Sequence, residues 1–183
     1  MAIIGPCRVS YLNCWEPRET PSGDLKYSVS VLIKDSDKAN IKKVNDAIQK
    51  AIEVALSKNV FPKAAVPNLR LPLRNGSEEF EMGNRGEEYN GHKFLNATSK
   101  NAPGIVGPDN QPLMDQNEIY SGCYCYVDLA FFGYNQAGNR GIGVGFNNIM
   151  KYKDGDRLDG RQSAESAFKD IKPENVEEGD DLT

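Results

Sequence analysis

The stretch Cys123-Tyr-Cys-Tyr-Val-Asp-Leu-Ala-Phe-Phe-Gly-Tyr134 decides the fold, because its side chains alternate between an apolar and a mixed face. A period of two is typical of a β-strand with one buried side. After Asn135-Gln-Ala-Gly138 a second alternating stretch follows, in which Ile142, Val144 and Phe146 are interleaved with glycines. The two stretches together predict a long antiparallel hairpin.

The register of this hairpin depends on the length of its loop. A four-residue loop over residues 135–138 pairs Tyr134 with Asn139 and places both apolar stripes on one face. A loop of five residues would mix the faces, because a slip of one residue moves every side chain to the other side of the sheet. We therefore predict the four-residue loop, which leaves the outer face with the aromatic side chains Tyr124, Tyr126, Phe132 and Tyr134 beside Gly141, Gly143 and Gly145.

Four further elements can be read from periodicity. Residues 25–34 alternate as a half-buried strand, with Leu32 as the one exception, and residues 7–15 are the expected partner strand. Apolar residues recur at helical spacing from about Asp37 to Lys58. Residues 60–91 contain three prolines and four glycines, which predicts a long irregular insertion, and residues 92–99 form another short strand.

Composition favours one loop-rich, strand-dominated domain over residues 1–168. The chain has 183 residues, of which 17 are glycine and 10 are proline, and it contains no apolar run of the roughly 20 residues needed to span a bilayer. The first residues do not resemble a signal peptide. We therefore expect a protein of the cytoplasm with reduced cysteines, and of the host-cell cytoplasm if a phage encodes it.

The sequence offers little support for a metal site or for catalysis. The four cysteines form no C-x-x-C pair, and His92 is the only histidine. Cys123 and Cys125 fit an apolar core stripe better than a zinc site, because a free cysteine behaves as a small hydrophobe. The chain has neither a Walker lysine motif nor a G-x-S-x-G motif. We expect no metal, no cofactor and no enzymatic activity.

The aromatic face of the hairpin has two interpretations that periodicity does not separate. The rings can form a platform on which bases stack without regard to sequence. They can instead fold down over the glycines and cover them. Cations interleaved with aromatic side chains in a neutral body favour single-stranded nucleic acid. The residues that we predict to bind this nucleic acid are Arg8, Tyr11, Trp15, Lys26, Lys93, Lys100, Tyr124, Tyr126, Phe132, Tyr134, Arg140 and Lys151.

Residues 169–183 are predicted to form a disordered acidic tail. They hold six acidic residues against two lysines, a net charge of −4 that equals the net charge of the whole chain. So polar a segment cannot recover its ordering entropy by burial. It is either a solubility tail or a built-in competitor for a groove that binds an anion.

Several colinear motifs resemble a family of phage single-stranded-DNA-binding proteins. They include Arg8-Val-Ser-Tyr-Leu-Asn13, Asn96-Ala-Thr-Ser-Lys100 and Gly143-Val-Gly-Phe-Asn-Asn-Ile149, and the matching segments span residues 8–168. The resemblance implies an OB-fold, a Greek-key β-barrel, that binds single-stranded DNA with little sequence preference in phage replication or recombination. It also implies that the tail docks replication proteins through Glu177, Glu178, Asp180 and Asp181.

The order of the elements departs from a plain OB-fold. A plain OB-fold carries its helix between the third and fourth strands, whereas here the helix follows the second predicted strand. We therefore expect an elaborated barrel. An RNA-binding or strand-annealing module, and a Mg²⁺-dependent nuclease, remain alternative functions. The residues define no oligomeric state.

Overall fold

The computed structural model describes residues 1–158 and 164–171, so the predicted docking residues Glu177, Glu178, Asp180 and Asp181 lie outside the described part of the chain. The strands are β1 (Ala2–Glu19), β2 (Leu25–Lys34), β3 (Arg74–Asn75), β4 (His92–Ser99), β5 (Gly104–Val106), β6 (Tyr124–Gln136) and β7 (Asn139–Lys153). The helices are α1 (Lys38–Ser57), α2 (Gly76–Glu81), α3 (Ala164–Ala167) and the 3₁₀ helices η1 (Lys63–Asn68) and η2 (Glu87–Tyr89).

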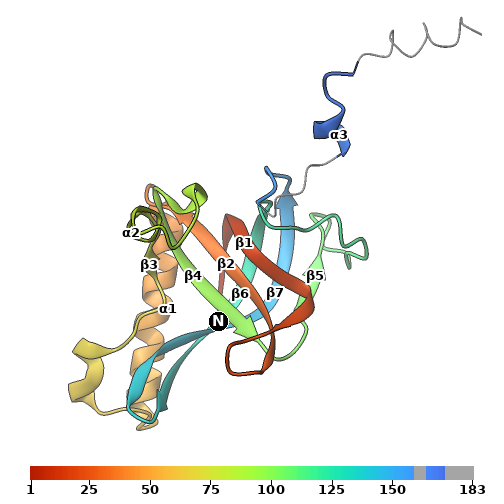
Figure 1. Cartoon of the computed structure of the whole chain (residues 1–183). Helices are drawn as coiled ribbons and strands as arrows, with labels where there is room; N and C mark the ends of the chain where they lie inside the picture. Colours follow the sequence, from red (N-terminus) through yellow and green to blue (C-terminus); the bar gives the residue numbers. More distant parts are fainter. Residues whose placement is uncertain (159–163, 172–183) are drawn as a thin grey trace, which may run out of the picture.

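Five of the strands close into a barrel (Figure 1). The sheet runs in the order β4-β2-β1-β6-β7, and a parallel pairing of Thr98 on β4 with Gly145 on β7 joins its ends. β3 and β5 add short edges to β4 and β7. This is the five-stranded Greek-key barrel of an OB-fold, so the expected fold is confirmed.

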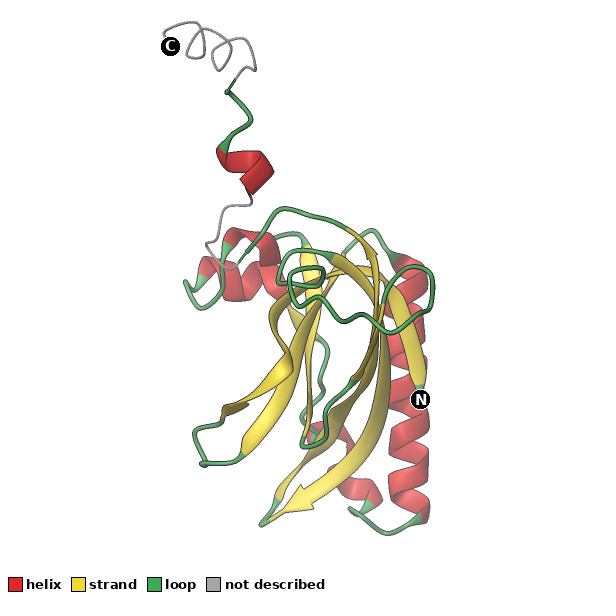
Figure 2. Ribbon diagram, turned by 90° about the vertical axis from the view of Figure 1, so that its right-hand side faces the viewer, coloured by secondary structure: helices red, strands yellow, loops and turns green. Residues whose placement is uncertain are grey.

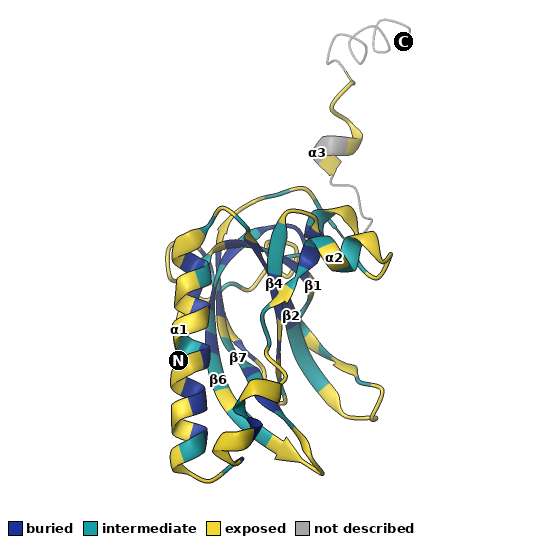
Figure 3. Ribbon diagram, turned by 90° about the vertical axis from the view of Figure 1, so that its left-hand side faces the viewer, coloured by how far each residue is buried: buried dark blue, intermediate teal, exposed yellow. Residues whose placement is uncertain are grey.

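Helix α1 packs on the barrel with one apolar face, visible as its buried side in Figure 3. Asp37 caps its first turn by accepting a hydrogen bond from the backbone N–H of Asn40 at 3.2 Å. The Asn40 amide in turn exchanges two hydrogen bonds with the backbone of Gly5, at 3.2 and 3.3 Å, which fastens the helix to β1. The helix lies between the second and third barrel strands in chain order, as the sequence predicts.

The four-residue loop predicted for the β6–β7 hairpin is wrong, because the observed loop is two residues shorter. Gln136 pairs with Asn139, so the loop consists of Ala137 and Gly138 alone. Both have positive φ, +51° and +88°, which suits the two-residue turns that match the twist of a hairpin. Alanine seldom adopts this conformation, so the sequence gives little sign of the turn. The predicted faces are nevertheless right, because a shift of two residues preserves them.

The insertion between α1 and β4 is more ordered than its composition predicts. It contains η1, β3, α2 and η2, and Tyr89 at its end is fully buried. Tyr89 packs with Leu32 and Phe94 in a small second core on the outer side of β2 and β4, and its hydroxyl donates to Ser30 Oγ at 2.9 Å. This second core explains why Leu32 breaks the alternation of β2.

The two long hairpins point the same way. The tips of β1–β2 and of β6–β7 project from one end of the barrel, while the last residues of β7 lie at the opposite end (Figure 1; the same arrangement from the side in Figure 2). Among the described residues, no helix is long and apolar enough to cross a membrane.

Candidate nucleic-acid interface

A groove of about 770 Å³ lies on the outer face of β2 and β4, between the β6–β7 hairpin and the insertion. Its polar and aromatic lining residues are Lys26, Arg70, Arg74, Asn96, Thr98, Phe132, Tyr134 and Gln136. No acidic residue belongs to the described lining. OB-folds bind oligonucleotides on the face formed by their second and third strands, which are β2 and β4 in this chain.

Phe132 is one of the two aromatic residues that line this groove, and it lies against bare backbone. A Cβ atom at Gly143 would come within 2.7 Å of its ring, and one at Gly141 would come within 2.8 Å of the Tyr134 hydroxyl. Phe132 still exposes 49% of its surface. The two interpretations of the aromatic face therefore both describe it in part, since the ring covers a glycine and keeps an open surface toward the groove.

The cations of the groove come from separate segments. Lys26 lies near the start of β2, whereas Arg70 and Arg74 belong to the insertion. The Arg74 guanidinium is 2.7 Å from a carboxylate oxygen of Glu79 and lies over the Phe94 ring, 5.1 Å from its centroid. These contacts position Arg74 on the wall of the groove.

The predicted aromatic platform divides into two parts. Tyr126 contacts Tyr152 edge to face at 5.8 Å, and the Lys153 ammonium lies 4.9 Å from the centroid of the Tyr124 ring. Neither Tyr124 nor Tyr126 lines the groove. A strand as long as β6 twists around the barrel, and a bulge after Asp128 adds to the twist. The two ends of the outer face of β6 therefore point to different sides of the barrel.

Two predicted cations are engaged in other contacts. Arg8 donates to the carbonyl oxygens of Gly122 at 3.1 Å and Asp156 at 2.7 Å, which ties β1 to the segments on either side of the β6–β7 hairpin. Lys93 forms an ion pair with Asp35 at 3.6 Å. Neither residue lines the groove.

Three other candidates also lie away from the groove lining. Trp15 is partly buried against the main core. Lys100 is exposed just beyond the end of β4. Arg140 lines a different hollow, between η1 and the tip of the β6–β7 hairpin.

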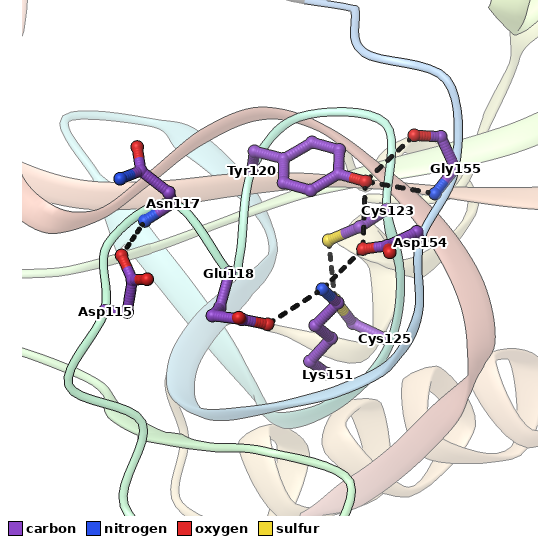
Figure 4. Close-up of polar contacts among 9 residues, drawn as sticks. All are labelled: Asp115, Asn117, Glu118, Tyr120, Cys123, Cys125, Lys151, Asp154 and Gly155. Atoms are coloured by element: carbon purple, nitrogen blue, oxygen red, sulfur yellow. Dashed lines mark hydrogen bonds and ion pairs between the residues drawn. The ribbon is translucent and has the colours of Figure 1, made fainter. Parts of the chain in front are cut away.

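Lys151 is buried near the end of β7, at the end of the barrel opposite the hairpin tips. Figure 4 shows the polar side chains around it. Its ammonium lies 2.5 Å from a carboxylate oxygen of Asp154 and 3.4 Å from one of Glu118, and the Tyr120 hydroxyl also donates to Asp154 at 3.2 Å. Burial alone would lower the pKa of Lys151, but the two carboxylates outweigh it and raise that pKa. Lys151 thus ties together the loops at this end, and it is not part of the groove.

The cysteines belong to the core. All four are free and buried, and the Cys123 and Cys125 sulfur atoms lie 3.5 Å apart. Burial raises the pKa of Cys7 and of Cys14 to about 12, so these thiols stay protonated near neutral pH. Within the described residues, no group of three or more His, Cys, Asp or Glu side chains could hold a metal ion.

The sequence analysis did not predict five polar residues of the groove: Arg70, Arg74, Asn96, Thr98 and Gln136. Asn96 and Thr98 do carry a signal, because they alternate with buried Leu95 and Ala97 as the polar face of a strand. The two arginines lie in an insertion without periodicity, and no pattern marks them. Only three of the predicted DNA-binding residues, Lys26, Phe132 and Tyr134, are brought together in the groove.

A barrel of this topology, with an aromatic and cationic groove on this face, defines a nucleic-acid-binding OB-fold protein. A family model described as the single-stranded-DNA-binding protein of Enterobacter phage Enc34 matches residues 1–182. The chain belongs to this family of phage single-stranded-DNA-binding proteins, which confirms the resemblance found in its motifs. The family is one of binding proteins, which agrees with the expectation that the chain is not an enzyme.

Individual relatives span nearly the whole chain. Putative protein p50 of Acyrthosiphon pisum secondary endosymbiont phage 1 is 28% identical, over 96% of this chain and 90% of that protein. The structure of the bacteriophage Enc34 single-stranded-DNA-binding protein in complex with single-stranded DNA has a TM-score of 0.66 at 19% identity, covering 85% of this chain and 88% of the other. Bacteriophage T7 gp2.5, a single-stranded-DNA-binding protein, has a TM-score of 0.57 at 14% identity, covering 95% of both chains. These likenesses establish a shared fold.

Proposed function

We propose that the protein binds single-stranded DNA in the groove between β4, the insertion and the β6–β7 hairpin. Bases stack on Phe132 and Tyr134, and phosphates pair with Lys26, Arg70 and Arg74. The observation that carries this proposal is the half-exposed Phe132 ring, seated on Gly143 in a groove lined by cations. Stacking of this kind is tolerant of sequence, because every base has a π-face.

The groove suits a single strand better than a duplex. A duplex hides the faces of its bases within the stack, whereas an unpaired strand offers them to Phe132 and Tyr134. The family and the relatives named above support DNA as the ligand. We infer that the protein acts in phage DNA replication or recombination, in the cytoplasm of the host cell.

The test is a titration with labelled oligonucleotides of equal length and sequence. We expect single-stranded DNA to bind well above duplex DNA and above RNA, and to remain intact with Mg²⁺. Equal affinity for the duplex, or no binding at low salt, would contradict the proposal. Tighter binding of RNA would favour the RNA-binding alternative, and degradation of DNA with Mg²⁺ but not with EDTA would favour a nuclease.

The acidic tail is proposed to compete with DNA for the groove and to dock replication proteins through Glu177, Glu178, Asp180 and Asp181. Deleting residues 169–183 removes a net charge of −4. A tethered anion competes at high effective concentration, so the deletion should tighten DNA binding, most clearly at low salt. The melting temperature should barely change. Unchanged DNA affinity at low ionic strength would leave the segment as a solubility tail.

A further inference from the structure

Tyr11 has an unusual backbone conformation that turns its ring outward. It lies where the pairing of β1 with β2 shifts register, between Ser10 and Asn13, and its φ is +45°. Non-glycine residues in this region are uncommon and tend to occur at functional sites. Asn13 supports the bulge by donating to Ser28 Oγ at 3.0 Å and to the Tyr11 carbonyl oxygen at 3.3 Å. Tyr11 exposes 54% of its surface.

One neighbour of the Tyr11 ring is the guanidinium of Arg85. Its central carbon lies 5.1 Å from the centroid of the Tyr11 ring, and 5.7 Å from those of Tyr89 and Phe94. Such distances are typical of cation–π contacts. The buried Nε of Arg85 has no hydrogen-bond acceptor among the residues that the structure describes.

The segment that carries Arg85 is held by Glu79. The Glu79 carboxylate accepts hydrogen bonds from Asn84 at 3.0 Å and from Arg74 at 2.7 Å, and these bonds hold the pKa of Glu79 below its usual value. The Glu79 carbonyl oxygen also accepts from the backbone N–H of Arg85 at 3.3 Å. Arg74 and Arg85 are thus presented from one small unit of the insertion.

Tyr11 is joined to the groove by an unbroken series of ring contacts. Arg74 lines the groove and lies over Phe94, whose ring meets the Tyr89 ring edge to face at 5.0 Å. The Tyr89 ring is 6.4 Å from the Tyr11 ring. The strands give a second connection, because Thr98 in the groove pairs with Ser28, to which Asn13 beside Tyr11 is bonded.

We propose that Tyr11 and Arg85 form a second subsite for one unpaired nucleotide of the same strand. The base stacks on the open face of the Tyr11 ring, which places the ring between the base and the guanidinium, and Arg85 donates to the adjoining phosphate. The inference rests on the proposed function, because the strand must already lie in the groove. The single-stranded DNA would then run from the β6–β7 hairpin across β4 and β2 to the bulge of β1.

The test compares variants over a series of oligo-dT lengths. Tyr11→Gly removes the ring and suits the positive φ, so the backbone of the bulge should be kept. Arg85→Gln removes the charge, and Arg85→Lys keeps the charge without the planar guanidinium. Tyr152→Ala, at a tyrosine of similar exposure that lies away from both sites, is the matched control.

We expect the shortest oligonucleotides that fill the groove to bind Tyr11→Gly and Arg85→Gln like the unchanged protein. Longer ones should bind Tyr11→Gly roughly 5- to 150-fold more weakly, the range for loss of one stacked base. For these longer strands, Arg85→Gln should also reduce the log–log salt slope by about 0.7, and Arg85→Lys should retain the slope. Tyr152→Ala should match the unchanged protein at every length.

Failure of this subsite and failure of the groove give different results. If Tyr11→Gly and Arg85→Gln bind every length normally while Phe132→Ala binds weakly, the second subsite is wrong and the groove stands. If Phe132→Ala also binds normally, the groove itself is wrong. Should Tyr11→Gly not fold, Arg85→Gln with the same oligonucleotides decides the question.

Discussion

Replacing Phe132 with alanine should weaken binding of single-stranded DNA by about 1–3 kcal/mol, and replacing Tyr134 as well should add a loss of similar size. Phe132 is half exposed in the groove, so its loss removes a stacking surface but little of the core. The melting temperature should therefore change only slightly. Fluorescence anisotropy titrations run beside thermal melts measure both effects.

Tyr124→Ala is the matched control for this pair. Tyr124 is on the same strand and the same outer face, but it lies beside Lys153 away from the groove. Its replacement should leave DNA affinity unchanged. If the Phe132 and Tyr134 variants instead unfold more easily while their folded fraction binds normally, the two rings serve only to cover Gly143 and Gly141.

Replacing Lys26, Arg70 and Arg74 together with glutamine should reduce the salt dependence of binding. Each phosphate neutralised on a single strand contributes about −0.7 to the log–log slope, so three lost contacts should flatten the slope by about 2. If the variant and the unchanged protein bind equally well at 1 M salt, the variant should bind roughly 100-fold more weakly than the unchanged protein at 0.1 M salt. A titration of affinity against salt concentration measures the slope directly.

A second triple variant separates groove contacts from net charge. Lys34, Lys42 and Lys93 lie outside the groove lining, so replacing them with glutamine makes the same change in charge elsewhere. This variant should keep nearly the whole slope. Equal flattening by both triple variants would show that DNA responds to the overall charge of the protein and that the groove cations have no special role.

The fold was largely predictable because its main elements have clear periodicity. Each of β2, β6, β7 and α1 has one buried face. Such a face produces a regular spacing of apolar residues that can be recognised in the local sequence. The loop of the β6–β7 hairpin was not predictable, because Ala137 adopts a positive φ that alanine rarely takes. The insertion was underestimated, because it is built from short pieces around one buried tyrosine, Tyr89.

The candidate site was predictable only in part, because tertiary placement decides which cations are available. Lys26 and Lys151 look alike in the sequence, yet Lys26 lines the groove and Lys151 is buried between two carboxylates. Tyr126 and Phe132 share one face of β6, yet the twist of the strand directs them to different sides of the barrel. Alternation with a period of two predicts on which face of a strand a side chain lies. It does not predict to which side of the barrel that face points at each position of a long, twisted strand.

The most direct test of where DNA binds is photo-crosslinking of a single-stranded oligonucleotide that carries 5-iododeoxyuridine, followed by mass spectrometry of the linked peptides. The account predicts crosslinks to Phe132 or Tyr134 on β6, in the outer half of the β6–β7 hairpin, and their loss when unlabelled single-stranded DNA is added in excess. Crosslinks confined to Tyr124, Tyr126 and Tyr152 would place the strand on another side of the barrel and contradict the account.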